Sequence, residues 1–186
     1  MPWPENAVNA EELFEKFSPM VYNLALRLSG NKADAQDIAQ DAFLKAVRGL
    51  GDLREQSFAG TWLYRITVNV WKNRVRSEKR RSFWKTISLD WGGGDDEKAA
   101  MQVAAPDAPV DAALEKQDEK TALEAALAQL DPEDRAMLVL REIDGRSYAE
   151  ISGITGKPLG TVKSGISRAR EALRLKMGAL LKDNGT

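Results

Sequence analysis

The sequence predicts an all-α protein made of two small helical domains joined by a flexible acidic linker. Apolar residues recur at helical spacing in two long parts of the 186-residue chain, and no stretch alternates as a strand would. Between these parts lie Gly92, Gly94 and Pro106, and no apolar period persists there. This segment is too long for a loop inside one compact domain. We therefore assign residues 1–82 to the first domain, 83–112 to the linker and 113–186 to the second domain.

Three helices are expected in the first domain. Asn9 is placed to cap the first helix, and Pro19 within its apolar stripe predicts a kink or a short first turn. Asn31 can cap the second helix, which Gly49 ends. The third helix is expected over about residues 58–81, a span without proline.

The second domain shows a series of helix starts. Asp131 followed by Pro132 is a strong start signal, because Asp caps a helix and Pro suits its first position. Ser147 and Glu150 form the pattern of a capping box for a short helix. After a glycine–proline break, the last helix is expected over about residues 160–181.

The composition argues against most enzyme classes. The chain has no cysteine and no histidine, so disulfides, Ser-His and Cys-His triads, and zinc sites built from those residues are excluded. Carboxylate chemistry with magnesium stays open, but we expect no catalytic residue, no metal and no cofactor. No apolar run approaches the roughly 18 residues of a membrane span, so we expect no membrane insertion. The lack of cysteine fits a cytoplasmic location.

The net charge of −1 hides a strong division of charge along the chain. Residues 61–85 carry 8 basic and 1 acidic side chains, and residues 156–186 carry 7 and 2. The other segments are net acidic. Local basic clusters bind phosphates even when a whole chain is neutral, so these two blocks favour nucleic-acid binding over two merely solvated helix faces.

The second domain ends in a predicted helix-turn-helix. A short helix, a glycine-containing turn and a longer helix have this order, and Ala149 is expected to face the last helix where the two cross. The last helix has an apolar back and a polar front that can enter a major groove. The candidate duplex-binding residues of this helix are Thr161, Lys163, Ser164, Ser167, Arg168 and Arg170.

The third helix carries a stripe that suits unpaired bases. An aromatic ring, amides and cations recur on one face, and rings stack on exposed bases while cations follow phosphates. The preceding loop is placed to surround a base that has left the stack. The candidate residues are Arg54, Ser57, Phe58, Trp62, Arg65, Asn69, Lys72, Asn73, Arg76 and Arg80.

The second helix carries an acidic face that is suited to docking on a protein. Asp34, Asp37 and Asp41 fall at i, i+3 and i+7 and therefore share one face, with Gln40 and Lys45 beside them. The simplest interpretation is that this acidic face is only solvated. The alternative is that the face, with its amide, docks on a basic helix of a partner protein.

These segments together resemble the extracytoplasmic-function sigma factors of the sigma-70 family. In the second domain the resemblance lies in REIDGRSYAEI at 141–151, GTVKS at 160–164 and SRAREAL at 167–173. In the first domain it lies in DAQDIAQDAFLKA at 34–46 and FAGTWLYRI at 58–66. It implies a region 2 helical bundle and a region 4 helix-turn-helix.

The resemblance also implies roles. Asp34, Asp37, Gln40, Asp41 and Lys45 would bind core RNA polymerase, the third helix and its loop would melt and capture the minus-10 element, and the last helix would read the minus-35 element. Gly165 departs from the pattern, since many relatives carry arginine there; glycine would remove a phosphate contact and costs about 1 kcal/mol in helix propensity.

The resemblance further implies an anti-sigma partner, although no residue identifies it. The main alternative is a dimeric helix-turn-helix repressor or activator that binds duplex DNA without polymerase, as a two-fold dimer on paired half-sites. A helical adaptor without a DNA role and a carboxylate metalloenzyme are further alternatives. The aromatic and amide stripe and the two basic blocks disfavour them.

Overall fold

The computed structural model describes residues 10–53, 58–90 and 121–183, and every regular element in them is helical. The N-terminal half consists of α1 (Ala10–Ser29), α2 (Lys32–Arg48), the 3-10 turn η1 (Leu50–Asp52) and α3 (Ala59–Asp90). The C-terminal half has a helical segment at 121–128, α5 (Pro132–Leu138), the π-helical turn η3 (Val139–Ile143), α6 (Tyr148–Thr155) and α7 (Leu159–Asp183). The all-α prediction is confirmed.

The predicted helix starts that fall on described residues have the expected caps. The side chain of Asn31 accepts a hydrogen bond from a first-turn backbone N–H of α2 at 2.8 Å, and Asp131 caps α5 in the same way. Ser147 and Glu150 form a complete capping box on α6. Gly156 ends α6 with φ +69°, a left-handed conformation that glycine adopts without a Cβ clash.

Two sequence expectations about these helices are wrong. The third helix was expected to end near Arg81 and the linker to start at residue 83, but α3 continues to Asp90. Residues 82–90 contain no proline or glycine, so nothing stops the helix before Gly92. Ala149, expected at the helix crossing, is exposed; it lies two positions before the buried Ile151, and is therefore on the far side of α6.

Pro19 does not interrupt α1, which is continuous across it. The ring is exposed, so the hydrogen bond that proline cannot donate is lost on the solvent side. Within the described residues, none of the helices has the length and apolar character that crossing a membrane requires.

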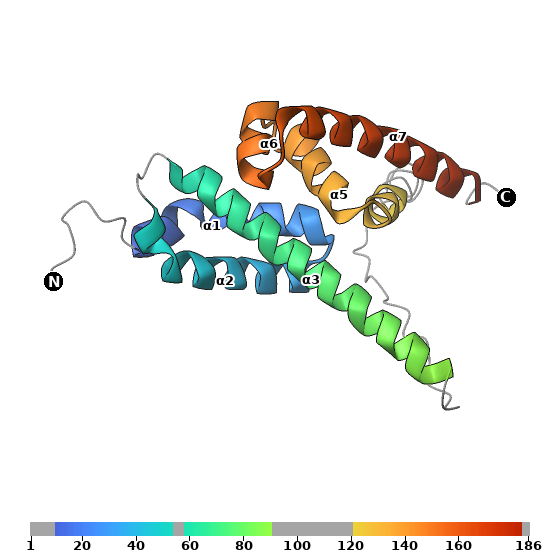
Figure 1. Ribbon diagram of the computed structural model, residues 1–186, viewed down its shortest axis with the longest axis horizontal. Coiled ribbons are helices and arrows are strands. Elements are labelled where there is room, and N and C mark those ends of the chain that lie inside the picture. Colours follow the sequence, from blue (N-terminus) through green and yellow to red (C-terminus); the bar gives the residue numbers. More distant parts are fainter. Residues whose placement is uncertain (1–9, 54–57, 91–120, 184–186) are drawn as a thin grey trace, which may run out of the picture.

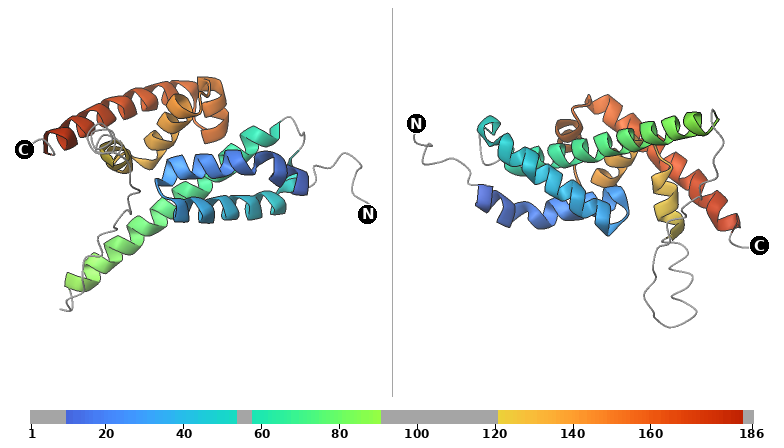
Figure 2. Two further views of the ribbon diagram at one scale, coloured as in Figure 1. Left: turned by 180° about the vertical axis from the view of Figure 1, so that it is seen from behind. Right: turned by 90° about the horizontal axis from the view of Figure 1, so that it is seen from below.

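The long helix α3 lies between the other helices of the N-terminal half and the C-terminal half, and it packs on both (Figure 1). Leu63 and Val70 are buried on the side where α1 and α2 pack. Tyr64, Val68 and Trp71 are buried on the other side, at 5 %, 1 % and 3 % exposure, against the C-terminal half. One apolar core therefore passes through α3 into both halves, and Figure 2 shows α5 and α6 beside this helix from two further directions.

Polar contacts surround this apolar interface. Arg146, which precedes α6, donates from Nη2 to the hydroxyl of Tyr64 at 3.0 Å, and its guanidinium lies 4.4 Å from the centre of that ring. Arg27 of α1 pairs with Asp144, whose side chain is only 3 % exposed. The two halves are thus held by charge-assisted contacts as well as by apolar packing.

Glu133 of α5 is the most connected charge at the interface. Its carboxylate lies 2.9 Å from Lys72 Nζ, 2.8 Å from Lys157 Nζ and 3.5 Å from Arg76 Nη2. Hydrogen bonds from Lys157 and Lys72 lower the pKa of Glu133 to about 2. The carboxylate therefore stays ionised and ties α3 to α5 and to the turn before α7 over most of the pH range.

Gly165 lies where α7 crosses α5. It is buried, and a Cβ on it would overlap Cε of Met137 and stand 3.2 Å from Oδ1 of Asp134. The expectation that position 165 faces phosphates is wrong, because this position points into the helix crossing. Glycine here permits close approach of the two helices.

We predict that Gly165→Arg is less stable to unfolding than Gly178→Arg by about 1–3 kcal/mol, because both changes gain helix propensity but only the first overpacks a helix crossing. Urea unfolding measures this difference. Gly178→Arg on the same helix is the matched control, since a Cβ at Gly178 meets nothing within 4 Å. Equal stability of the two variants would contradict the packing role of Gly165.

A second prediction concerns pH. Because the pKa of folded Glu133 lies near 2, below the ordinary value near 4.5, its contribution is complete above about pH 4.5 and is lost as the pH falls toward 2. Glu133→Gln should therefore cost about 1–2 kcal/mol of unfolding free energy at pH 7 and progressively less between pH 4.5 and 3. Chemical unfolding at each pH tests this, with exposed Glu12→Gln as control. A cost that does not change with pH would refute the assignment.

Candidate nucleic-acid and protein interfaces

The outward side of α3 presents most of the row that the sequence predicts. Asn69 and Asn73 are exposed, and the cations Arg65, Arg76 and Arg80 lie with them at helical spacing on one side. The two asparagines lie on neither of the packed sides of α3, whereas Arg76 also reaches Glu133 of α5. The row presents hydrogen-bonding amides and positive charge to solvent.

The aromatic ring at the start of the row, that of Trp62, is partly packed against the end of α2. Trp62 is half-buried, and Cζ2 of its indole would lie 3.3 Å from a Cβ on Gly49, at the end of α2. Glycine at that position makes room for the ring. Phe58, one turn earlier, is 59 % exposed. Two rings are therefore accessible near the start of α3, whereas Arg54 and Ser57 lie outside the described residues.

Lys72 does not join the exposed row. Its side chain is only 12 % exposed, and its ammonium group is held by Glu133. Arg76 touches the same carboxylate but keeps 60 % of its side chain exposed. Lys72 is therefore set apart from the other residues predicted to contact DNA. Sequence spacing alone could not show this, because it does not reveal that α5 covers this edge of α3.

The acidic face of α2 divides into two parts. Asp34 and Asp37 both pair with Arg74 of α3, the second at 3.2 Å, so they also hold α2 on α3. Gln40 and Asp41 are exposed, as is Lys45. The predicted docking surface is thus open mainly in its second half.

Sequence reasoning missed the apolar part of this face. Leu44 and Val47 are each 49 % exposed. Leu44 lies four residues after Gln40 and three after Asp41, which places it between them one turn on. Nearby, Phe14 of α1 is 54 % exposed and packs edge-on against Phe43, with ring centres 4.9 Å apart. The sequence does contain a signal for Leu44 and Val47, because these apolar residues fall outside the helical stripe of Ala35, Ile38 and Ala42, which is buried.

The helix-turn-helix has the predicted back and front. Val162, Ile166 and Ala169 of α7 are buried. All six predicted duplex-binding residues are exposed: Thr161, Lys163, Ser164, Ser167, Arg168 and Arg170. The front of α7 is therefore a polar, mainly basic surface.

Neighbouring acids hold two of these arginines. Arg168 Nη2 lies 3.4 Å from Asp134 of α5, and Arg170 Nη2 lies 2.6 Å from Glu142 of η3. Both arginines keep more than half of their side chains exposed, at 62 % and 52 %. Such exposed pairs are weak, so phosphates can displace the carboxylates at little cost.

Family models match both halves. Sigma-70 region 2 matches residues 13–81, and Sigma-70, region 4 matches residues 120–173. The chain is 33 % identical over 169 residues to the RNA polymerase sigma-H factor of Pseudomonas aeruginosa, covering 90 % of this chain and 86 % of that protein. It is 36 % identical over 151 residues to the ECF RNA polymerase sigma-E factor of Escherichia coli K12, covering 80 % of this chain and 76 % of that protein.

Solved structures agree with these matches. The sigma factor RpoE of Bartonella quintana, solved in complex with the anti-sigma factor NepR, is 28 % identical with a TM-score of 0.58, over 92 % of this chain and 96 % of that one. CnrH, solved with the cytosolic domain of CnrY, has the same fold at 21 % identity, with a TM-score of 0.59 over 91 % of this chain and 88 % of that one.

These matches span both halves in the order that the motifs predict, and they set aside the dimeric repressor or activator as an explanation of the chain. The chain therefore belongs to the extracytoplasmic-function class of the sigma-70 family, whose members direct RNA polymerase to promoters.

Proposed function

We propose that this chain binds core RNA polymerase through α2, reads the minus-35 element with the front of α7, and captures the melted minus-10 element on α3. The exposed row on α3 is the observation that carries this proposal. Asn69, Asn73 and the half-buried Trp62 face one direction on a helix whose other sides are buried over residues 63–71. A duplex-only reader has no need of such a row.

The free energy of binding unpaired bases is large enough to offset the opening of a few base pairs. Stacking in DNA averages about 1.4 kcal/mol per step. A base stacked on an aromatic side chain recovers roughly 1–3 kcal/mol. Rings at Phe58 and Trp62, together with the amides and arginines of the row, could therefore hold a few unpaired bases without a nucleotide-driven motor.

The position of Lys72 implies that the two halves must move apart before this residue can contact DNA. In the docked arrangement its ammonium is neutralised by Glu133, which α5 presents. Lys72 can reach DNA only if α5 moves away from α3. We propose that the two halves separate when the chain binds polymerase and promoter, and that phosphates then replace Glu133.

The docking surface for polymerase is proposed to centre on Leu44. Exposed apolar side chains ringed by polar ones are typical of protein interfaces. Gln40, Asp41 and Lys45 supply the polar rim, and Asp37 lies at its edge. A basic helical partner surface with an apolar ridge would match this arrangement.

An anti-sigma partner and a cytoplasmic location belong to the same proposal. RpoE of Bartonella quintana was solved with an anti-sigma factor, which supports a comparable partner here. We propose no catalytic role for the chain, because sigma function requires none.

The first functional prediction uses reconstituted transcription with purified core polymerase. Asn69→Ala should reduce promoter opening about tenfold, because a contact to an unpaired base is lost, while duplex binding stays unchanged. Reactivity of unpaired thymines to permanganate measures opening. Asn23→Ala, an exposed asparagine of α1, is the control. Normal opening by Asn69→Ala would count against the row on α3.

Arg168→Ala should instead weaken binding of the holoenzyme to the upstream element by about 1–3 kcal/mol. Filter binding at several salt concentrations measures this loss and the accompanying change in salt slope. Arg174→Ala, also exposed on α7, is the matched control. If both variants bind alike, α7 does not read the element through Arg168.

Leu44→Asp should weaken binding to core polymerase at least tenfold, about 1.4 kcal/mol, because it places a charge at the proposed apolar centre. Fluorescence anisotropy of the labelled protein measures the affinity. Leu175→Asp introduces the same change at a leucine of α7 that is 59 % exposed, and should leave the affinity unaltered. An unchanged affinity for Leu44→Asp would exclude this docking centre.

A further inference from the structure

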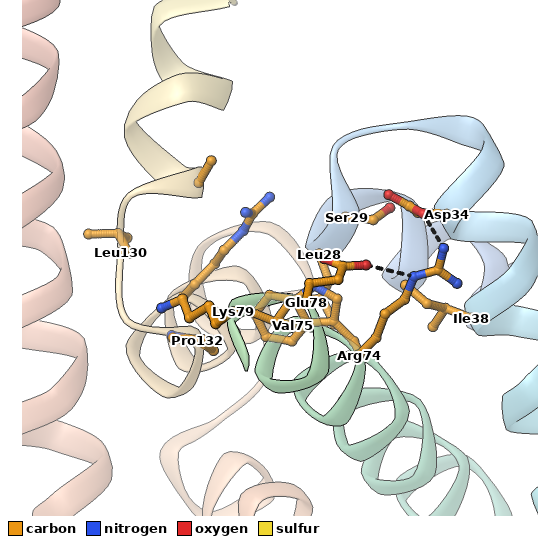
Figure 3. Close-up of a pocket in the computed structure, with 13 residues that line it drawn as sticks. Leu28, Ser29, Asp34, Ile38, Arg74, Val75, Glu78, Lys79, Leu130 and Pro132 are labelled. Atoms are coloured by element: carbon orange, nitrogen blue, oxygen red, sulfur yellow. Dashed lines mark hydrogen bonds and ion pairs between the residues drawn. The ribbon is translucent and has the colours of Figure 1, made fainter. Parts of the chain in front are cut away.

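A cavity of about 210 Å³ lies between the two halves, beside α3 (Figure 3). Trp71, Val75 and Lys79 line it from α3, and Leu130 and Arg135 line it from the C-terminal half. The cavity is therefore built by both halves of the molecule and is separate from the exposed rows on α3 and α7.

Arg135 is the unusual residue of this cavity. It is only 8 % exposed, and its guanidinium lies 5.7 Å from the ring centre of Trp71. Its Nε is buried, and among the described residues no acceptor lies within hydrogen-bonding distance of it. The other such arginine, Arg146, differs because its terminal nitrogens bond Tyr64 and Glu150.

The nearby carboxylates do not neutralise Arg135 directly. Asp34 and Glu78 line the same cavity, but both pair with Arg74, as Figure 3 shows. Burial lowers the pKa of Arg135, and the charge of Glu124 opposes that shift only in part. Among the described residues, no carboxylate forms an ion pair with this guanidinium. A buried cation in this state is unfavourable unless an anion joins it.

The volume limits what can join it. A single water takes about 30 Å³ of liquid, so the cavity holds more than one. Sites for drug-sized ligands begin at roughly 300 Å³, so a nucleotide does not fit. One carboxylate or one phosphate group has the right size and charge.

We propose that this cavity binds a single anionic group, a carboxylate or a phosphate, with Arg135 as its main ligand and Trp71 beside it. Lys79 of α3 lines the same cavity, so the bound anion contacts cations from both halves. Its binding favours the docked arrangement, in which Glu133 holds Lys72.

The test uses the full chain labelled with ¹⁵N, titrated with sodium phosphate or sodium acetate against sodium chloride at matched ionic strength. The arginine Nε–H resonance that is absent from Arg135→Met reports the site directly. We expect this resonance to shift saturably with phosphate, acetate or both, and the responding salt identifies the group that binds. A response to neither salt beyond that to chloride overturns the proposal.

Thermal unfolding gives a second, independent measurement. The responding anion should raise the Tm of the wild-type chain and of the control Arg174→Met by several degrees beyond chloride, and it should not do so for Arg135→Met. In chloride alone, Arg135→Met should melt no lower than the wild type, because an unpaired buried charge has been replaced by an apolar side chain of similar length. A lower Tm in chloride would show that the guanidinium already has a structural partner, and would also overturn the proposal.

Discussion

The burial of α3 on two sides is the interaction on which the rest of the structure depends. Leu63 and Val70 join it to α1 and α2, and Val68 and Trp71 join it to the C-terminal half. Because these contacts belong to one continuous core, they fix which remaining side of α3 faces solvent. That side carries Asn69 and its neighbours. The accessible row is therefore a consequence of packing on the other sides of the helix.

The same double packing explains where sequence reasoning succeeded and where it failed. Local signals were sufficient for the caps at Asn31, Asp131 and Ser147, because each cap depends on residues within one turn. They were insufficient for Trp71, whose ring packs against Arg135, 64 positions away in the chain. A helix buried on two sides has no single apolar stripe, so Tyr64 and Trp71 gave no clear pattern. The end of α3 at Asp90 is not visible in the sequence pattern, because residues 82–90 have weak apolar periodicity although they contain no helix breaker.

The candidate surfaces show the same limit. The front of α7 could be predicted completely, since Val162, Ile166 and Ala169 define its back by spacing alone. Position 165 could not be predicted, because its neighbour Met137 comes from another helix. Lys72 looked like the rest of its row in sequence, and only the position of Glu133 distinguishes it. Pairwise contacts between distant segments decided each of these cases.

The chain is nearly neutral overall although it contains two strongly basic blocks, and ion pairs between segments join these blocks to acidic parts of the chain. Acidic residues of the segment 121–155 form ion pairs with basic residues of α3 and α7: Asp134 with Arg168, Glu142 with Arg170 and Glu133 with Lys72. The first two pairs are exposed and cheap to exchange for phosphate, whereas the third is partly buried and shared with Lys157. The front of α7 is consequently accessible in this arrangement, and the proposed duplex contact requires no movement of the two halves. Under the proposed mechanism, the full row of α3 becomes available only after the halves part, so the free chain would withhold the surface proposed to capture a strand more strongly than the surface proposed to read a duplex.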